Sequence, residues 1–133
     1  MMVLKRYASN LYNMTQTIQR AQQEVDAAGK APGRVATEIA RILRVKDKPT
    51  FTPHIDAGDA VIVTNASQLV FTGDKLVQKD YYHHTMYPGG LKTKSMKRVF
   101  DENPGDVIRR AVYGMLPKNK HRDEMMKRLT IKN

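Results

Sequence analysis

Two segments of the chain carry hydrophobic patterns that predict secondary structure directly. Residues 33–45 place Val35, Ile39 and Ile42 at the three- and four-residue spacing of a helix with one apolar stripe. On this helix Arg34 and Glu38 are spaced to form an ion pair one turn apart. Residues 60–65 are apolar on both faces of an extended chain, which is typical of a central strand covered on two sides.

A third segment is marked by its ends as well as by its pattern. Asn103 can cap a helix, and Pro104 suits its first position because proline has no N–H to leave unpaired. Residues 107–116 then carry a broad apolar face, and Pro117 ends it. We therefore expect a well-defined helix between the two prolines.

Shorter patterns complete the expected fold. Residues 23–27 and 129–131 predict strands, and residues 95–100 and 123–127 predict short helices. Because strands and helices alternate along the chain, an α/β fold is favoured. Residues 1–20 are polar, basic and weakly periodic, so we expect an N-terminal basic arm over 1–20 and a single α/β domain over 21–133.

The stretch from Tyr81 to Lys94 has the most unusual composition. It holds three tyrosines and two histidines within seven residues, then a Pro-Gly-Gly turn and the start of a cationic run. We expect a strand over about residues 81–86, in which Tyr81 and Tyr82 point to opposite faces so that one of them lies in the core. Aromatic rings and lysines around a glycine turn are typical of a nucleic-acid surface. An ordinary strand and turn with a solvated face has the same composition.

Charge favours the nucleic-acid interpretation. The 133 residues carry a net charge of +10 and a pI near 9.9. Residues 1–74 hold 9 basic and 7 acidic side chains, a net of +2, whereas residues 75–133 hold 14 and 6, a net of +8. Such an excess repels itself unless a polyanion neutralises it. Nucleic acid is the leading partner, and an anionic membrane surface is the weaker alternative.

The sequence offers little for catalysis or metal binding. There are no cysteines, and no apolar run approaches the length of a membrane span. His83 and His84 are adjacent, so on a strand they point apart and do not share a metal ion. Asp56 and Asp59 stand near a glycine, where aspartate usually forms turns. We expect no enzyme activity, no catalytic residue, no metal and no cofactor.

Six blocks of the sequence resemble the ribosomal protein L13 family of the large subunit. The resemblance covers about residues 23–131 in unbroken order. Its blocks are Gly29–Arg34, Lys48–His54, Gly58–Ala66, Thr72–Lys75, Tyr81–Lys92 and Arg110–Asn119. His83 departs from the family pattern, because arginine is common at its position, and the segment Gln22–Val25 lacks the aromatic residues usual in the first strand.

The resemblance implies a three-layer α/β/α domain around a small, mostly parallel four-stranded sheet. It also implies a structural protein that binds large-subunit rRNA, joins the particle early in assembly, contacts neighbouring large-subunit proteins and catalyses nothing. Some family relatives repress translation outside the ribosome. A free RNA-binding regulator is therefore the alternative, and an enzyme acting on RNA is a distant third.

The expected location is the cytoplasmic ribosome of a bacterium, with an organellar ribosome as the alternative. No membrane and no small-molecule substrate are expected as partners. Lysines and arginines would neutralise phosphates, and the aromatic and histidine side chains would stack or donate hydrogen bonds. The candidate RNA contacts are Lys46, Lys48, His54, Lys75, Tyr82, His84, Lys92, Lys94, Lys97, Arg98, Arg110, Lys118, Lys120 and Arg122.

Overall fold

A computed structural model describes residues 18–49 and 51–133, so the predicted arm of residues 1–20 falls almost wholly outside the described residues. The strands are β1 (Gln22–Asp26), β2 (Ala60–Thr64), β3 (Asp80–His84), β4 (Leu91–Ser95) and β5 (Leu129–Ile131). The α-helices are α2 (Pro32–Leu43), α3 (Lys75–Gln78), α4 (Met96–Glu102), α5 (Pro104–Met115) and α6 (His121–Lys127). The predicted α/β class is confirmed.

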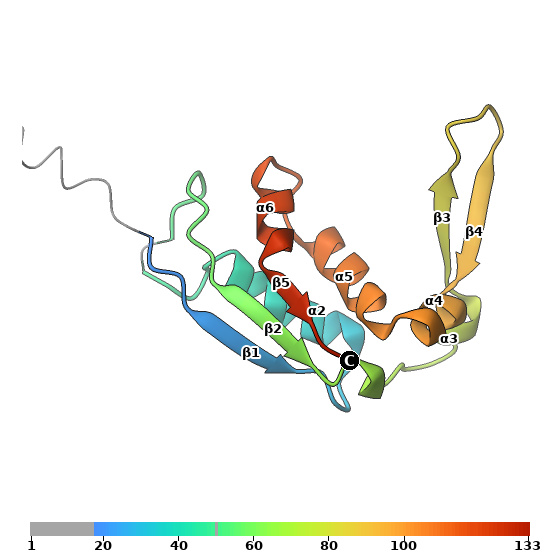
Figure 1. The fold of residues 1–133 in the computed structure, drawn as a ribbon, viewed down its shortest axis with the longest axis horizontal. Helices are drawn as coiled ribbons and strands as arrows, with labels where there is room; N and C mark the ends of the chain where they lie inside the picture. The colour runs from blue at the N-terminus through green and yellow to red at the C-terminus, as the bar shows by residue number, and fades with distance from the viewer. Residues whose placement is uncertain (1–17, 50) are drawn as a thin grey trace, which may run out of the picture.

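The main sheet contains three parallel strands in the order β1-β2-β5 (Figure 1). In one row across it, Val25 pairs with Val63 and Val63 with Ile131. The prediction that residues 60–65 form the central strand is confirmed. We expected four strands, but the strand at Tyr81 belongs to a separate two-stranded sheet formed by β3 and β4.

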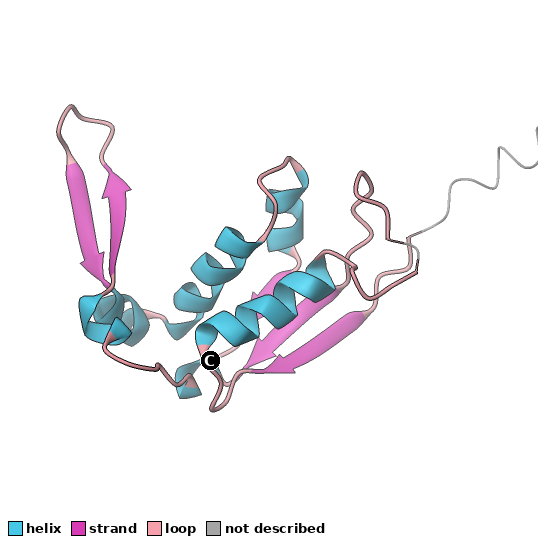
Figure 2. Cartoon of the chain, turned by 180° about the vertical axis from the view of Figure 1, so that it is seen from behind, coloured by secondary structure: helices cyan, strands magenta, loops and turns pink. Residues whose placement is uncertain are grey.

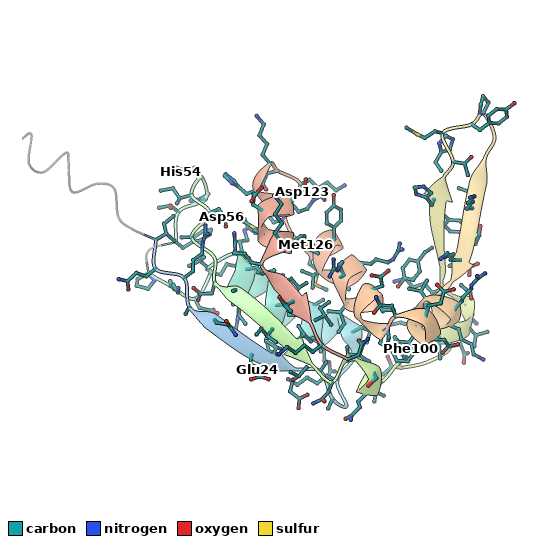
Figure 3. The ribbon with its side chains drawn as sticks, in the orientation of Figure 1. Glu24, His54, Asp56, Phe100, Asp123 and Met126 are labelled. Atoms are coloured by element: carbon teal, nitrogen blue, oxygen red, sulfur yellow. The ribbon has the colours of Figure 1, made fainter. Side chains whose placement is uncertain are left out.

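Two long helices cover one face of this sheet. Figures 1 and 2 show α2 and α5 on the same side of the strands. On the opposite face, the row Glu24–Ile62–Thr130 alternates with the buried positions, and Glu24 and Thr130 are exposed. Figure 3 labels Glu24 on β1. No helix among residues 18–49 and 51–133 covers this face. The described chain thus has two layers where three were expected, and Ile62 is only partly buried.

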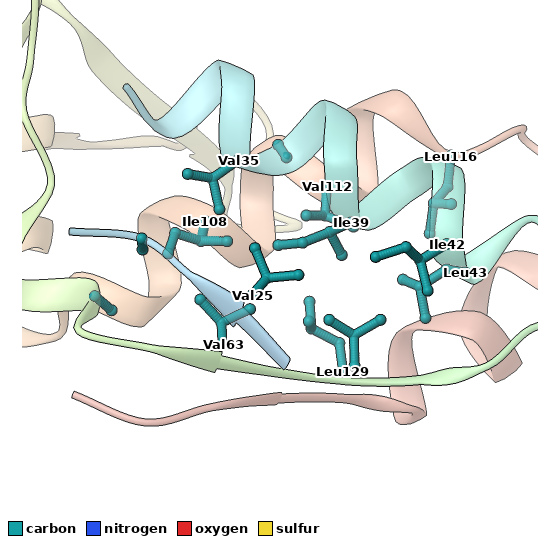
Figure 4. Packing of buried hydrophobic residues seen from close by; sticks show 14 of the residues in the cluster. Val25, Val35, Ile39, Ile42, Leu43, Val63, Ile108, Val112, Leu116 and Leu129 are labelled. Atoms are coloured by element: carbon teal, nitrogen blue, oxygen red, sulfur yellow. The ribbon is translucent and has the colours of Figure 1, made fainter. Parts of the chain in front are cut away.

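The core lies between the sheet and the two long helices (Figure 4). The predicted stripe of α2 is buried: Val35 and Ile39 are 0% exposed and Ile42 is 8% exposed. They meet Ile108 from α5 and Val63 from β2. Asn103 caps α5, since its side-chain oxygen accepts the N–H of Gly105 at 3.1 Å. Periodicity explains which face of each core helix is buried, and capping by Asn103 explains where α5 begins, whereas α2 begins at Pro32 without a side-chain cap.

The β3–β4 hairpin projects from the far end of the molecule on a separate small core (Figure 1). Met96 and Val99 of α4 form this core with Val107 of α5, and Phe71 and Tyr81 pack against it. The sequence predicted β3 but described residues 91–94 as a cationic run. β4 was missed because its side chains Leu91 to Lys94 are all exposed, so its pattern carries no contrast between a core face and a solvent face.

An ion pair ties the loop before β2 to the end of α6. Both nitrogens of the Arg128 guanidinium fork lie 2.6 Å from the Asp56 carboxylate oxygens. Gly58 lies against this pair, and a Cβ there would overlap the carbonyl oxygen of Leu43. Close approach of the backbone is possible here because glycine has no side chain. None of the described helices has the length and apolar character needed to cross a membrane.

Candidate nucleic-acid interface

The β3–β4 hairpin has two chemically different faces. The antiparallel register pairs Tyr81 with Lys94 and His83 with Lys92, so these four side chains share one face. Tyr82 and His84 lie on the other face, opposite Thr93 and Leu91. The predicted contacts Lys92 and Lys94 are thereby separated from the predicted contacts Tyr82 and His84. An RNA strand on one face of the hairpin meets the two lysines beside Tyr81 and His83, whereas a strand on the other face meets Tyr82 and His84 without a lysine.

The aromatic face of the hairpin is open to solvent. Tyr82 is 66% exposed and Leu91 is 61% exposed. The Nδ1 atom of His84 accepts the backbone N–H of Met86 at 3.1 Å. Its Nε2 atom is then the ring nitrogen that can donate to a phosphate or a base. This face suits base stacking and hydrogen bonding more than charge neutralisation.

The tip of the hairpin is a glycine turn, as predicted. The N–H of Gly90 donates to the carbonyl of Tyr87 at 2.9 Å, and Gly89 has φ +74°, a conformation that glycine adopts without strain. A Cβ on Gly90 would overlap Oγ1 of Thr85. Met86 and Tyr87 at the tip are 91% and 75% exposed. Two large side chains are therefore held away from the core by a turn that requires glycine.

The cations at the base of the hairpin are not all free. Glu102 binds two of the predicted contacts, because its carboxylate oxygens lie 2.8 Å from Arg98 Nε and 3.4 Å from Lys94 Nζ. The hydrogen bonds from Arg98 and Lys94 lower the pKa of Glu102 below its usual value. Lys92 and Lys97 are exposed and make no ion pair with any acid that the structure describes. They are the unengaged cations of this region.

A second cationic region lies where α5 meets α6. The Arg122 guanidinium carbon stands 3.8 Å from the centre of the Tyr113 ring, and Arg122 Nη2 donates to the Tyr113 hydroxyl at 2.7 Å. This stacking fixes Arg122. Lys118 and Lys120 lie exposed in the connector before α6. Asp123 and Met126 face the groove between α5 and α6 (Figure 3). The lining of this groove contains both acidic and basic side chains, so its charge is mixed.

A cleft of about 550 Å³ opens beside the base of the hairpin. We call it the Tyr81 cleft, because the Tyr81 ring forms one wall and lies 4.8 Å from the Arg110 guanidinium carbon and 5.4 Å from Lys79 Nζ. Burial raises the pKa of Tyr81, against a smaller opposing effect of the Arg110 charge, so the phenol stays neutral. The charged lining residues, called the rim cations below, are Arg34, Lys75, Lys79 and Arg110.

The Tyr81 cleft joins predicted and unpredicted residues. Lys75 and Arg110 were predicted contacts, whereas Arg34 and Lys79 were not. Arg34 was expected to pair with Glu38, but the Glu38 carboxylate lies 3.5 Å from Lys30 Nζ. The one signal for Arg34 in the sequence is its place in the first block of the family resemblance. Lys79 had no such signal, because it lies in the unpredicted connection between α3 and β3 and outside every block of the family resemblance.

The remaining predicted contacts lie apart from the hairpin. Figure 3 places His54 in the loop before β2, at the other end of the molecule, and both His54 and Lys46 are exposed. Lys48 Nζ lies 2.6 Å from a carboxylate oxygen of Asp59, which is 2% exposed. The Lys48 charge is thus already neutralised. Over residues 18–49 and 51–133, no cluster of three or more acidic or histidine side chains has an arrangement that would hold a metal ion.

Comparison with known proteins gives one consistent result. The sequence model of the family described as ribosomal protein L13 matches residues 20–132. The large ribosomal subunit protein uL13 of Clostridioides difficile is 56% identical over 114 residues, which are 86% of this chain and 80% of that protein. The protein of the same name from Geobacter sulfurreducens is 53% identical over 80% of this chain and 75% of its own. The protein of the same name from Geobacillus kaustophilus is 50% identical over 114 residues, which are 86% of this chain and 79% of that protein.

Proposed function

Because the chain belongs to the ribosomal protein L13 family, we propose that it is a structural constituent of the large ribosomal subunit that binds rRNA and supports early assembly. The observation that carries this proposal is the family match, which spans residues 20–132. The distribution of charge supports it. Cations gather on the hairpin, the Tyr81 cleft and the α5–α6 connector, whereas the open sheet face presents Glu24 and Asp26.

The proposed contacts with rRNA fall into three groups. The hairpin and α4 supply phosphate contacts through Lys92, Lys94, Lys97 and Arg98, and Tyr82 and His84 contact bases or sugars. Lys75 and Arg110 act from the Tyr81 cleft. Lys46, His54, Lys118, Lys120 and Arg122 add contacts from the loops and from α6. Support is weakest for Lys48, because Asp59 already holds its ammonium group.

The partners that follow are large-subunit rRNA and neighbouring large-subunit proteins. The relatives come from bacteria, so the particle is the ribosome of the bacterial cytoplasm. The role is structural and not catalytic. It involves no cofactor, small-molecule substrate or membrane, because the family match and the cationic surfaces explain the chain through RNA binding alone.

Fractionation of cells that express the tagged full chain tests this proposal. Nearly all copies should sediment with large subunits and remain there after a high-salt wash. The double variant Lys92→Gln with Lys97→Gln should be released at lower salt, since with each lost phosphate contact fewer counterions are released, which weakens binding. Lys132→Gln, which changes an exposed lysine beyond β5 that is not a proposed contact, is the control and should be compared with each single variant, Lys92→Gln and Lys97→Gln. If most copies of the protein were instead free of ribosomes, and the protein protected one messenger hairpin but no rRNA from cleavage, it would be an RNA-binding regulator.

A further inference from the structure

The Tyr81 cleft combines a cationic rim with an apolar floor. The floor is built from Met96 and Val107, which are 3% and 2% exposed, together with Phe71 and Ala111. It rests on the small core beneath the hairpin, where the Phe71 ring meets Phe100 edge to face at 5.0 Å. The floor is therefore a fixed surface and not a gap between mobile side chains.

The residues that line this cleft include four cations and no acid. Asp106 and Asp123 line the neighbouring groove between α5 and α6, and Arg110 lines both the groove and the cleft. Among residues 18–49 and 51–133, none of the rim cations forms an ion pair. Four like charges around one opening repel each other, and the repulsion is relieved when an anion enters. The first turn of α2 opens toward the same space without an acidic residue, which adds to the positive potential.

An occupant that matches both parts of the cleft must be planar and apolar at one end and anionic at the other. An RNA nucleotide whose base has left its stack has this chemistry, because the base presents a flat face and the flanking phosphates carry charge. A volume of about 550 Å³ lies within the range of pockets that enclose small ligands. The Tyr81 ring supplies a side wall, and Arg110 and Lys79 near that ring stand where phosphates would pass.

We propose that the Tyr81 cleft receives one unstacked nucleotide of the bound rRNA, with its base on the Phe71–Met96–Val107 floor and its phosphates at the rim cations. This inference rests on the proposed function, because the strand that delivers the nucleotide is the rRNA. It goes further by assigning a single-nucleotide subsite to Met96 and to the lining residues within 31–34, 71–81 and 107–115. Arg34, Lys79 and Tyr81 then become contacts of this subsite.

Site-directed photocrosslinking tests the subsite with the full chain bound to large-subunit rRNA. Each base type is replaced in turn by a photoreactive analogue, and crosslinked peptides are mapped by mass spectrometry. We expect one nucleotide to crosslink to Phe71, Tyr81 or Met115. Arg110→Gln should reduce this crosslink at least about fivefold while leaving crosslinks at the hairpin tip unchanged. Arg109→Gln is the matched control, because Arg109 is the neighbouring exposed arginine of α5 and does not line the cleft.

A second measurement separates base insertion from simple charge attraction. A short RNA that contains the crosslinked nucleotide should bind at least about fivefold more tightly than the same RNA with an abasic residue there, since stacking of the base is lost. Tyr81→Ala should abolish that difference. Equal binding of the intact and abasic RNAs would overturn the subsite. Equally tight binding of a free mononucleotide, followed through the Tyr81 ring resonances, would overturn the assignment to an rRNA strand.

The two proposals fail in different ways. Crosslinks confined to the hairpin and to residues 118–122, in a chain that still sediments with large subunits, would leave the proposed function intact and refute the nucleotide subsite. Loss of sedimentation with large subunits would refute the proposed function, and the subsite would fall with it. A cleft crosslink in a sedimenting chain supports both.

Discussion

Lys48 Nζ lies 2.6 Å from Oδ1 of Asp59, so a lysine whose side chain is 36% exposed binds a buried carboxylate. Asp59 is 2% exposed, and its carboxylate also accepts the N–H of Ala21 at 3.0 Å and Nε2 of Gln23 at 3.0 Å. The buried Asp59 carboxylate therefore joins three segments: its own loop before β2, the loop after α2 and the start of β1. Lys48 was predicted as an RNA contact, but its position favours a structural role.

Lys48→Met should therefore reduce stability more than RNA binding. The substitution leaves the Asp59 carboxylate buried without its cation, and we expect a loss of about 1–3 kcal/mol in the free energy of unfolding, measured by urea denaturation. Lys46→Met is the matched control. That side chain is exposed, so its effect should stay within about 0.5 kcal/mol. A Lys48→Met protein of unchanged stability that binds rRNA poorly would contradict the structural role.

Two aspartates should make the fold sensitive to acid. Burial by itself raises the pKa values of Asp56 and Asp59, but the hydrogen bonds and charges of Arg128 at Asp56 and of Lys48 at Asp59 outweigh it, so both pKa values lie below 3.8. A lowered pKa in the folded state contributes stability that is present above 3.8 and is lost as the pH falls through the folded-state value.

Urea midpoints measured from about pH 5 to about pH 3 should fall steeply in the natural chain and less steeply in Asp59→Asn. Asp101→Asn is the control, because Asp101 is exposed and makes no ion pair with a described residue. An Asp59→Asn protein with the same pH dependence as the natural chain would show that this carboxylate is not coupled to folding.

Replacing Gly58 or Gly114 with alanine should change the free energy of unfolding in opposite directions. A Cβ on Gly58 would overlap the Leu43 carbonyl and come within 2.7 Å of Arg128 Nη2. We therefore expect Gly58→Ala to lower the free energy of unfolding by roughly 2–4 kcal/mol. Gly114 lies inside α5 with nothing within 4 Å of an added Cβ. Because alanine has the higher helix propensity, Gly114→Ala should raise the free energy of unfolding by about 0.5–1 kcal/mol. Thermal unfolding followed by circular dichroism measures both. Equal effects of the two changes would rule out close packing at Gly58.

Glu102 should compete with RNA for two cations. Glu102→Gln releases Lys94 and Arg98, so we expect tighter rRNA binding and a log–log salt slope steeper by up to about 1–2. Asp101→Asn raises the net charge equally but frees no described partner, and filter binding across a salt series compares the two. The proposed phosphate contacts of Lys94 and Arg98 would be refuted if both variants changed the slope by the same amount.

The sequence predicted the elements that have one buried face. The apolar stripe of α2 and the caps of α5 are local signals, and each was correctly placed to within a few residues. The pairing of β3 with β4 in a separate sheet, and not with the main sheet, was not predictable from such local signals. Tyr82 and His84 are exposed on one face, and on the other Tyr81 is half-buried while His83 is exposed, so alternation does not say which strands lie beside it.

The candidate interface was predictable in composition but not in arrangement. Counting cations identified the basic half, yet three predicted contacts are engaged by acids distant in the sequence or on the next turn: Lys48 by Asp59, and Lys94 and Arg98 by Glu102. Conversely, Arg34 joins Lys75 and Arg110 in one cleft although 76 positions separate the first from the last (110 − 34). Such neighbours are determined by tertiary packing, which single-sequence periodicity does not encode.

The pairing of β2 with β5 has a consequence for synthesis on the ribosome. Val61 pairs with Leu129, 68 positions later (129 − 61), so the parallel sheet and its helical cover close only after most of the chain has emerged. The hairpin is local by comparison, because Asp80 pairs with Ser95, 15 positions away (95 − 80). During translation the hairpin and the small core beneath it therefore emerge before the main sheet can be completed, so the end that carries most of the proposed RNA contacts can form before the main core closes.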